Sequence, residues 1–524
     1  MKKVLFLLII IVLLFSTLGC SSNRKTPFSS LEKVEEESIN YHIDKIVLSK
    51  GFQSIEPNVE VLKKNNNLKL LATLGLVECS GVEIDKITKS GKDINIYINC
   101  LSEKNKVQLA VPQVFIKIND PTLQKLEDVS FNIINNNYEP ISLKFSKNQI
   151  LNKIYSQFKI TPNTMPTVKL TKLKDNIVWN ISFHSIFDKE NSKFPLINFS
   201  VKVDAATGKI LDSKKDIISN YIDDGYLLDY IPHNYLLYKR QHNEKDNNYE
   251  SLWTYNIENG ERSKLYTSKD KIQSAKFSPD NKYISLIEVD GKKSDLYIIP
   301  RPDKIAYKIT PINYLQPQLM KWKDDSTLYF VDVNEDKSTL LSYDINKNTS
   351  KIEFTLEINV EDFDSAYDKF IFVEKDENSL NRNIYLTEDG IDLKEIDTGF
   401  KPTFFNENTI AYLKNVENED KNILHLYNME NDNEISNLDV NITSYFKLDD
   451  ENIVFVEKNT CNNDYTLTRY NVVENLATPI AKITSDKIFY DSANERGYIN
   501  LTPPLDDSKS AIYSIDLKKL NGPF

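Results

Sequence analysis

The sequence is poor in the residues and motifs that most enzymes use at their active sites. It has only five histidines, and no two of them form the i, i+4 pair that would indicate a metal site. It contains no G-x-S-x-G elbow, no H-E-x-x-H motif, no P-loop and no G-x-G-x-x-G turn. The C-x2-C and Cys/His spacings of zinc sites are also absent. We therefore predict no catalytic residue, no metal and no cofactor, and we favour a binding protein over an enzyme.

Basic residues are also in deficit. The formal net charge is -11, which excludes nucleic acid as a favoured partner, because phosphate binding needs a basic face. Glycine (13) and methionine (4) are few, whereas tyrosine (28) and phenylalanine (25) are plentiful. Such a composition favours strands. At 524 residues the chain is too long for one ordinary core, so we expect several domains.

Only one long apolar run is present, and it lies at the N-terminus. Lys2 and Lys3 precede an unbroken apolar run from Val4 to Phe15, which is typical of a secretory signal. The run is shorter than the roughly 20 residues that span a bilayer. Because no second such run follows, we expect the remainder of the chain to lie outside the cytoplasm.

The stretch Thr17-Leu18-Gly19-Cys20 follows this run and resembles a bacterial lipobox, with Thr17 where that family more often has leucine. In that family the cysteine is acylated and becomes the first residue of the mature protein. The resemblance implies a lipoprotein signal peptide over 1–19, a lipidated Cys20 followed by an acidic linker to residue 40, and a lipid anchor at the outer face of the cell membrane. The alternative is a plain secreted protein with an incidental cysteine.

Three further cysteines follow Cys20. Cys79 and Cys100 would close a loop of about 20 residues if they paired, which is worth roughly 3 kcal/mol on a chain-entropy estimate. Two unpaired buried thiols are an equal alternative. Cys461 has no evident partner.

The sequence of residues 41–140 predicts a β-rich domain, and we recognise no family to which it is similar. In "DINIYINCL", Ile94, Ile96, Ile98 and Cys100 fall on one face and polar residues fall on the other. This period of two predicts a half-buried strand.

Residues 141–215 predict one helix and several strands. "SKNQILNKIYSQF" has apolar residues at helical spacing, and Ser146 with Gln149 forms a candidate capping box. The strand "NIVWNISFHSIF" and the segment "VKVDAATGKIL" follow. The motif from Val203 to Ile210 resembles the PepSY family, whose members are extracytoplasmic and in some cases inhibit peptidases. No peptidase domain follows in this chain.

The second half of the chain is built from repeats of strand, turn and strand. Comparable positions recur at intervals of 40 to 45 residues, at Tyr255, Ile299, Tyr343, Thr387, Tyr427, Tyr470 and Ile515. Another apolar strand precedes each of them. Seven such repeats are the signature of a β-propeller, in which each four-stranded blade buries its faces against its neighbours.

One turn supports this interpretation. Ser278-Pro279-Asp280-Asn281-Lys282 resembles the "SPDG" turn of TolB-like propeller repeats, with Asn281 where glycine is usual. Asparagine tolerates the left-handed conformation that such a turn requires. The resemblance implies a TolB-like, WD40-like propeller of six to seven blades over 225–524, in which a terminal repeat is either shared between the two ends of the domain or partial. The predicted fold is therefore mainly β, with small α+β and β domains ahead of the propeller.

The acidic segment "EDFDSAYDK" supplies Asp362, Asp364 and Asp368, oxygen ligands of the type that calcium takes. It lacks the glycine and the closing glutamate of an EF-hand loop. We therefore interpret it as a solvated loop between blades rather than as a metal site.

Three functions are consistent with these observations. The favoured one is a membrane-anchored, non-enzymatic binding or scaffold protein, whose propeller binds another envelope protein or a small ligand. The second is an extracytoplasmic lyase or hydrolase with its site in the propeller channel, which would require several channel-facing carboxylates or histidines to converge. The third is a regulator of a peptidase or signalling system that acts through the PepSY-like unit.

Overall fold

The computed structural model describes residues 36–520 except 64–67, 119–128, 161–164, 175, 245–246, 292, 302–304, 313–314, 335–336, 377–378, 460–464, 484 and 504–509. The chain divides into two compact units, Met1–Ser142 and Leu143–Phe524, which we describe separately. The fold is mainly β, as predicted. Within the described ranges, no helix is long and apolar enough to cross a membrane.

The first unit consists of two sheets that share one apolar core. One sheet has the order β1-β6-β7-β9, from β1 (Glu37–Ser38), β6 (Gly81–Ser90), β7 (Asp93–Leu101) and β9 (Ser130–Asn135). The other has the order β2-β8-β4-β3 with β5 paired to β8, from β2 (Tyr41–Ser49), β3 (Pro57–Lys63), β4 (Leu68–Leu74), β5 (Val77–Cys79) and β8 (Gln108–Ile118). The predicted strand around Ile96 is confirmed as β7, whose isoleucines are buried between the sheets.

The second unit begins with one helix on a four-stranded antiparallel sheet. Helix α2 (Lys147–Phe158) covers one face of the sheet β10 (Thr167–Leu173), β11 (Asn176–Phe187), β12 (Leu196–Asp204) and β13 (Ile210–Ile217). The predicted capping box is confirmed, because Ser146 Oγ accepts from the Gln149 backbone and Gln149 Oε1 accepts from the Ser146 backbone. Ile150 and Ile154 are buried, and the ring of Phe158 contacts that of Phe199 at 4.8 Å.

The turn between β12 and β13 explains the sequence "DAATG". The Asp204 carboxylate accepts hydrogen bonds from the backbone N–H groups of Ala206 and Thr207 and from the Thr207 hydroxyl. These bonds hold the pKa of Asp204 below its usual value. Gly208 has φ +67°, and a Cβ there would lie 3.0 Å from the Phe145 ring. Glycine is therefore required both by the backbone conformation and by the ring packed on it.

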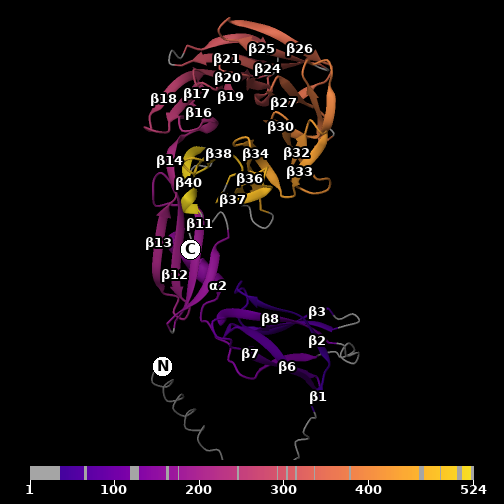
Figure 1. Cartoon of the computed structure of the whole chain (residues 1–524). Helices are drawn as coiled ribbons and strands as arrows, with labels where there is room; N and C mark the ends of the chain where they lie inside the picture. The colour runs from indigo at the N-terminus through magenta and orange to yellow at the C-terminus, as the bar shows by residue number, and fades with distance from the viewer. Residues whose placement is uncertain are drawn as a thin grey trace, which may run out of the picture. The chain divides into compact units, whose positions relative to one another are not determined.

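The rest of the second unit is a ring of seven four-stranded blades (Figure 1). The first three blades are β15 (Tyr226–Ile231), β16 (Tyr235–Glu244), β17 (Asn247–Asn256) and β18 (Arg262–Ser268); β19 (Lys271–Phe277), β20 (Tyr283–Asp290), β21 (Lys293–Pro300) and β22 (Tyr307–Ile312); and β23 (Met320–Trp322), β24 (Thr327–Asn334), β25 (Lys337–Asp344) and β26 (Thr349–Leu356). Blades four and five are β27 (Val360–Ala366), β28 (Lys369–Glu374), β29 (Arg382–Thr387) and β30 (Lys394–Asn406), then β30 again with β31 (Thr409–Asn415), β32 (Asn422–Asn428) and β33 (Asn433–Leu438). Blade six is β34 (Ile442–Lys447), β35 (Asn452–Lys458), β36 (Tyr465–Asn471) and β37 (Leu476–Ile483), and blade seven is β38 (Ile488–Asp491), β39 (Arg496–Leu501), β40 (Ala511–Asp516) and β14 (Ser219–Asp224).

The predicted repeat is confirmed strand by strand. Each of the seven recurring positions, from Tyr255 to Ile515, lies in the third strand of its own blade. In the turn after β19, Asn281 has φ +61° and its N–H donates to the Ser278 carbonyl at 2.9 Å. The left-handed conformation that the sequence predicts for Asn281 is therefore present.

The ring is closed by a strand from ahead of the first blade. β14 pairs antiparallel with β40, so Ser219 lies opposite Ile515, and it supplies the outermost strand of blade seven. β14 also continues β13 after a single residue, Ile218, which is buried with Leu196 in a core shared with the sixth and seventh blades. β13 of the helix-covered sheet and β14 of the propeller thus form one nearly continuous run of strand, which connects the two structures.

A short motif marks the two places where an outer strand runs straight into the next inner strand. The sequence is "IDDGY" before β15 and "IDTGF" within β30. A Cβ at Gly225 would lie 2.3 Å from the Lys239 carbonyl oxygen, and one at Gly399 would lie 2.6 Å from that of Leu413. Only glycine allows the outer strand to approach the next blade this closely.

The aspartate of each motif binds across the same boundary. Asp223 accepts from the Tyr238 hydroxyl at 2.6 Å and pairs with Arg240 at 2.5 Å. Asp397 accepts from the Tyr412 hydroxyl and pairs with Lys414 at 2.8 Å. The two crossings therefore use the same arrangement of aspartate, tyrosine and a basic residue.

Candidate functional site

Polar side chains of the strands near the ring axis connect every blade to the next. We call the set the inter-blade girdle, and it comprises Asp229, Lys276, Lys321, Asp364, Ser444, Tyr445 and Asn500. All except Asn500 lie on the innermost strand of a blade, and Asn500 lies on the second strand of blade seven. Together these side chains bridge all seven boundaries, so the ring is bonded around its whole circumference.

In blades one to five the girdle runs through charged groups. Asp229 accepts from the Phe277 N–H at 2.7 Å, and Lys276 donates to the Met320 carbonyl at 3.0 Å. Lys321 forms an ion pair with Asp364, which also accepts from the Phe404 N–H at 2.8 Å. Each bond joins one blade to the following one.

Neutral groups complete the girdle. The Tyr445 hydroxyl donates to the Ala411 carbonyl at 2.8 Å, between blades six and five, and the Ser444 hydroxyl donates to the Asp486 carbonyl at 2.8 Å, just ahead of β38. Asn500 Nδ2 donates to the Gly225 carbonyl at 2.7 Å, and its Oδ1 accepts from the Leu227 N–H at 2.8 Å. The last two bonds join blade seven to blade one.

The protein interior shifts the protonation equilibria of these groups. Burial raises the pKa of Asp229 to about 6, although the Phe277 N–H and Lys276 oppose the shift. Burial lowers the pKa of Lys276, with Asp229 and Asp362 acting in the opposite direction. Burial and the repulsion of Lys276 also lower the pKa of Lys321, and Asp362 acts in the opposite direction.

Asp362 lies among these charges without bridging two blades. Burial raises its pKa to about 6, while the Phe363 N–H, Lys276 and Lys321 lower it. Its position corrects one sequence interpretation. Asp362 and Asp364 lie on β27, an innermost strand, and only Asp368 lies in the adjoining turn, so the segment is not a solvated loop. Among the described residues, no group of three or more acidic, histidine or cysteine side chains is placed to hold a metal ion.

A pocket of about 760 Å³ lies where the first, sixth and seventh blades meet, between the starts of β15 and β38 and the residues Ser444 and Phe446 of β34. We call it the mouth pocket. Leu228, Phe446 and Phe489 contribute apolar surface, and Asp486 and Lys487 contribute charge. Apolar and polar residues line the pocket in roughly equal measure, so a partner could both pack against it and form hydrogen bonds with it.

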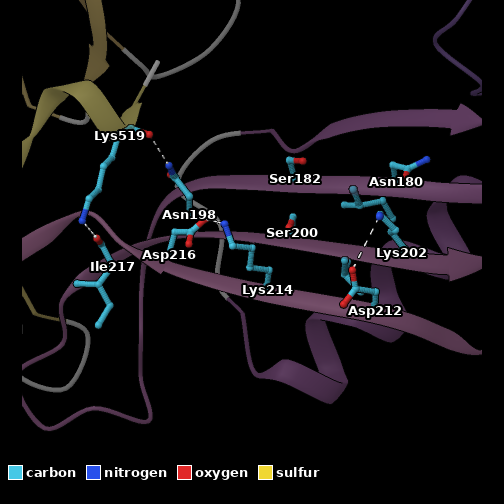
Figure 2. Close-up of a pocket in the computed structure, with 12 residues that line it drawn as sticks. Asn180, Ser182, Asn198, Ser200, Lys202, Asp212, Lys214, Asp216, Ile217 and Lys519 are labelled. Carbon is cyan, nitrogen blue, oxygen red and sulfur yellow. Dashed lines mark hydrogen bonds and ion pairs between the residues drawn. The ribbon is translucent and has the colours of Figure 1, made fainter. Parts of the chain in front are cut away.

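A second pocket, of about 530 Å³, lies on the face of the β11–β12–β13 sheet opposite α2 (Figure 2). We call it the sheet hollow. Its floor is a grid of cross-strand neighbours: Ser182 faces Ser200, Ser200 faces Lys214, Asn180 faces Lys202, and Lys202 faces Asp212. The hollow forms because the short serine side chains of the middle row lie between rows of longer side chains.

The C-terminal helix α3 (Leu517–Leu520) closes one end of the sheet hollow. The Lys519 carbonyl accepts from Asn198 Nδ2 at 3.1 Å, and Lys519 Nζ donates to the Ile217 carbonyl at 3.1 Å, as Figure 2 shows. The wall is therefore attached to the floor at two points.

The residues predicted as sites from the sequence fall in different places. Cys20 and Cys461 lie outside the described residues. Cys79 is buried at the end of β5, and its thiol lies within hydrogen-bonding distance of that of Cys100 on β7. The contact lowers the pKa of Cys79 and raises that of Cys100. Both are free thiols in this structure, and the structure brings them together across the two sheets.

Sequence reasoning missed the girdle and the sheet hollow. A signal for the girdle was present, because "YLLDYI", "KIQSAKF" and "EDFDSA" each place a charged residue in the first strand of a repeat. The hollow had no such signal, because its serines, lysines and aspartates look like the solvated face of any half-buried strand.

The sequence matches no family model and no curated protein. Several solved structures resemble the chain at low identity. The β-propeller domain of the trilobed protease from Pyrococcus furiosus is 16% identical with a TM-score of 0.44, over 57% of this chain and 100% of that one. Oligogalacturonate lyase from Vibrio parahaemolyticus is 13% identical with a TM-score of 0.43, over 61% and 96%. TolB from Acinetobacter baumannii is 13% identical with a TM-score of 0.33, over 66% and 86%.

Proposed function

We propose that the protein is a lipid-anchored binding protein outside the cytoplasm, which uses its propeller as a rigid docking platform for another envelope protein. The observation that carries the proposal is the mouth pocket on a ring that is bonded at all seven boundaries. A preformed surface loses little conformational entropy on binding, which favours stable association.

The anchor in this proposal comes from the sequence. Lys2, Lys3 and the apolar run end at Thr17-Leu18-Gly19-Cys20, which resembles a lipobox. Acylation at Cys20 would hold the protein at the outer face of the membrane, where a single lipid chain binds reversibly and further chains make the attachment stable.

The mouth pocket also supports docking through its composition. Phe446 and Phe489 come from neighbouring blades, and aromatic side chains are enriched at the centres of protein interfaces. Lys487 lines the same pocket and is exposed. Its positive charge would attract an acidic partner, and a negative charge in its place would repel that partner.

The test is crosslinking in cells followed by affinity capture and mass spectrometry, with Cys20→Ala and Lys487→Glu variants. We expect one envelope protein to be enriched with the native chain, and to be lost with either variant. Lys293→Glu, at the exposed first residue of β21, is the matched charge reversal and should not change the capture. Equal capture by the native chain and Lys487→Glu would contradict docking at the mouth pocket.

An enzymatic function is the second candidate, and Asp362 is the observation that favours it. Its pKa is raised to about 6, it lies beside Lys276 and Lys321, and it bridges no blade boundary, so it is not needed to hold the ring. A carboxyl group of this kind is suited to general acid or base chemistry in a lyase or hydrolase. Turnover of a glycan or peptide that Asp362→Asn abolishes and Asp368→Asn leaves intact would support it.

A regulatory role of the PepSY-like unit can be tested separately from docking and from enzymatic activity. A chain lacking residues 141–215 keeps β14, which begins at Ser219, and therefore keeps the closing strand of the ring. If a peptidase or signalling response is lost while partner capture persists, the helix-covered sheet acts as the regulator.

A further inference from the structure

We infer that the sheet hollow is a binding site for a small hydroxylated carboxylic acid of the sugar-acid class. The site is separate from the mouth pocket and does not depend on the docking function. It rests on the shape of the hollow, the charges around it and the hydrogen-bonding groups on its floor.

The shape is that of a site for one small molecule. The volume of about 530 Å³ lies within the range of ligand pockets. The middle row of the grid, Ser182 and Ser200, supplies the floor, and the taller side chains of the adjacent rows and of Lys519 supply the walls (Figure 2). Since backbone hydrogen bonds fix the strands that carry these residues, the floor is preformed.

The charges favour an acidic ligand. Lys202, Lys214 and Lys519 line the hollow with only Asp212 and Asp216 among them, in a protein whose formal net charge is -11. Lys214 pairs with Asp216 at 2.7 Å, and Lys202 pairs with Asp212 at 3.8 Å. Both pairs are exposed, and such pairs contribute little to stability, so the lysines can turn to a carboxylate in the hollow at small cost.

The floor favours a ligand that also carries hydroxyl groups. Within the described part of the chain, the hydroxyls of Ser182 and Ser200 have no hydrogen bond, so each can donate to a carboxylate or accept from a hydroxyl. Asp212 and Asp216 can accept from further hydroxyls of the ligand. A simple inorganic anion would use the lysines and serines but would leave the two aspartates facing it with like charge.

The test uses D-glucuronate as the probe, with D-glucose and inorganic phosphate as comparison ligands. Saturation-transfer NMR and calorimetry are carried out on the chain from residue 20 onward. We expect glucuronate to bind, and glucose and phosphate to bind at least about tenfold more weakly, because each lacks one of the two features that the hollow recognises.

Two variants locate the site. Ser200→Leu fills the hollow and should abolish glucuronate binding, and Lys214→Ala should weaken it about tenfold by removing a charged donor. Lys215→Ala is the matched control, because Lys215 is the next residue of β13 on the opposite face, where it contacts Asp188 and Glu190. Thermal unfolding of each variant shows whether it is folded.

Three results would overturn the inference. Unchanged binding in Ser200→Leu or Lys214→Ala would place the ligand elsewhere. Glucose bound as tightly as glucuronate would remove the role of the lysines. Phosphate bound as tightly as glucuronate would reduce the hollow to a general anion site.

Discussion

The two compact units hold their sheets together in different ways. In the first unit two sheets face each other across one apolar core, and the isoleucines of β7 pack on Val114 and Ile116 of β8. In the propeller seven sheets meet around an axis, where each boundary is bridged by a polar side chain. Apolar packing is sufficient to hold two sheets together where their facing sides exclude water from the core between them. In the propeller, apolar clusters also span neighbouring blades, and the directional bonds of the inner strands add to this packing near the axis.

Loss of the closing strand should have the largest effect. A chain that begins at residue 143 keeps β14 and should unfold cooperatively, whereas one that begins at residue 225 leaves β40 as an unpaired edge. We expect the shorter chain to lack a cooperative thermal transition or to aggregate. Ile222→Asp in the longer chain, which places a charge in the closed ring, should act in the same direction. Equal melting of the two chains would contradict strand closure as the stabilising device.

A methyl group at the strand crossing should have the next largest effect. Gly225→Ala requires φ +137° and places Cβ 2.3 Å from a carbonyl oxygen, so we expect a loss of more than about 3 kcal/mol in the free energy of unfolding. Gly291→Ala also has a positive φ but has open space around it, and should cost about 1 kcal/mol. Chemical denaturation measures both. A similar loss in the two variants would show that backbone conformation alone, and not close approach, accounts for the glycine.

The first unit should depend on its cysteine pair. If the protein lies outside the cytoplasm, as proposed, we predict that Cys79 and Cys100 form a disulfide there, each thiol losing one hydrogen to a thiol oxidant such as a second disulfide. Peptide mapping without reductant should find the two peptides linked, and reduction should lower the stability of this unit by about 3 kcal/mol. The double variant Cys79→Ser, Cys100→Ser should not respond to reductant. Complete alkylation of both thiols in protein purified without reductant would contradict the prediction.

A single break in the girdle should have a smaller effect. Asp364→Ala leaves the Phe404 N–H and the Lys321 ammonium without their acceptor, and we expect a loss of about 2 kcal/mol. Asp368→Ala, in the exposed turn four residues later, should change the free energy by less than about 0.5 kcal/mol. If both variants unfold at the same denaturant concentration, the girdle contributes nothing to stability.

The smallest expected effect is on pH dependence. Since the folded pKa of Asp362 is about 6 and its unfolded value is lower, the native state binds the proton more tightly. Stability is therefore lost as the pH rises from about 4 to about 6. Asp362→Asn should be more stable than the native chain at pH 7, by about 1 kcal/mol after allowance for solvent screening, and the difference should vanish near pH 4. A difference that does not change between pH 4 and 7 would exclude this origin.

The repeats made most of the fold predictable. Apolar second strands such as "YISLIEV" and the 40-to-45-residue spacing of the third strands are local signals, and the structure confirms them at every blade. The capping box at Ser146 and the left-handed Asn281 were predictable for the same reason, because each depends on neighbouring residues alone.

The rest depends on contacts between distant segments. β14 carries the sequence "SNYIDD", and nothing in it indicates that it pairs with the strand that contains Ile515. Asp364 has the sequence context of an acidic loop, and its role becomes evident only from its ion pair with Lys321 in the folded chain. The sheet hollow is a further case, since its floor depends on which residues of three strands become cross-strand neighbours. The motif "IDxG" at residues 222–225 and 396–399 could have marked both strand crossings had its two copies been compared.

The strand that closes the ring also sets an order of events during synthesis. Ser219 leaves the ribosome almost 300 residues before Ile515, its partner in β40, so the two cannot pair until those residues have also been synthesised. Until then β14 is an open edge, and contacts at such long separation form slowly. β13, directly ahead of it, can already be paired with β12. The helix-covered sheet would then keep the unpaired strand β14 attached to folded protein during synthesis, and so lower its exposure to other unfolded chains.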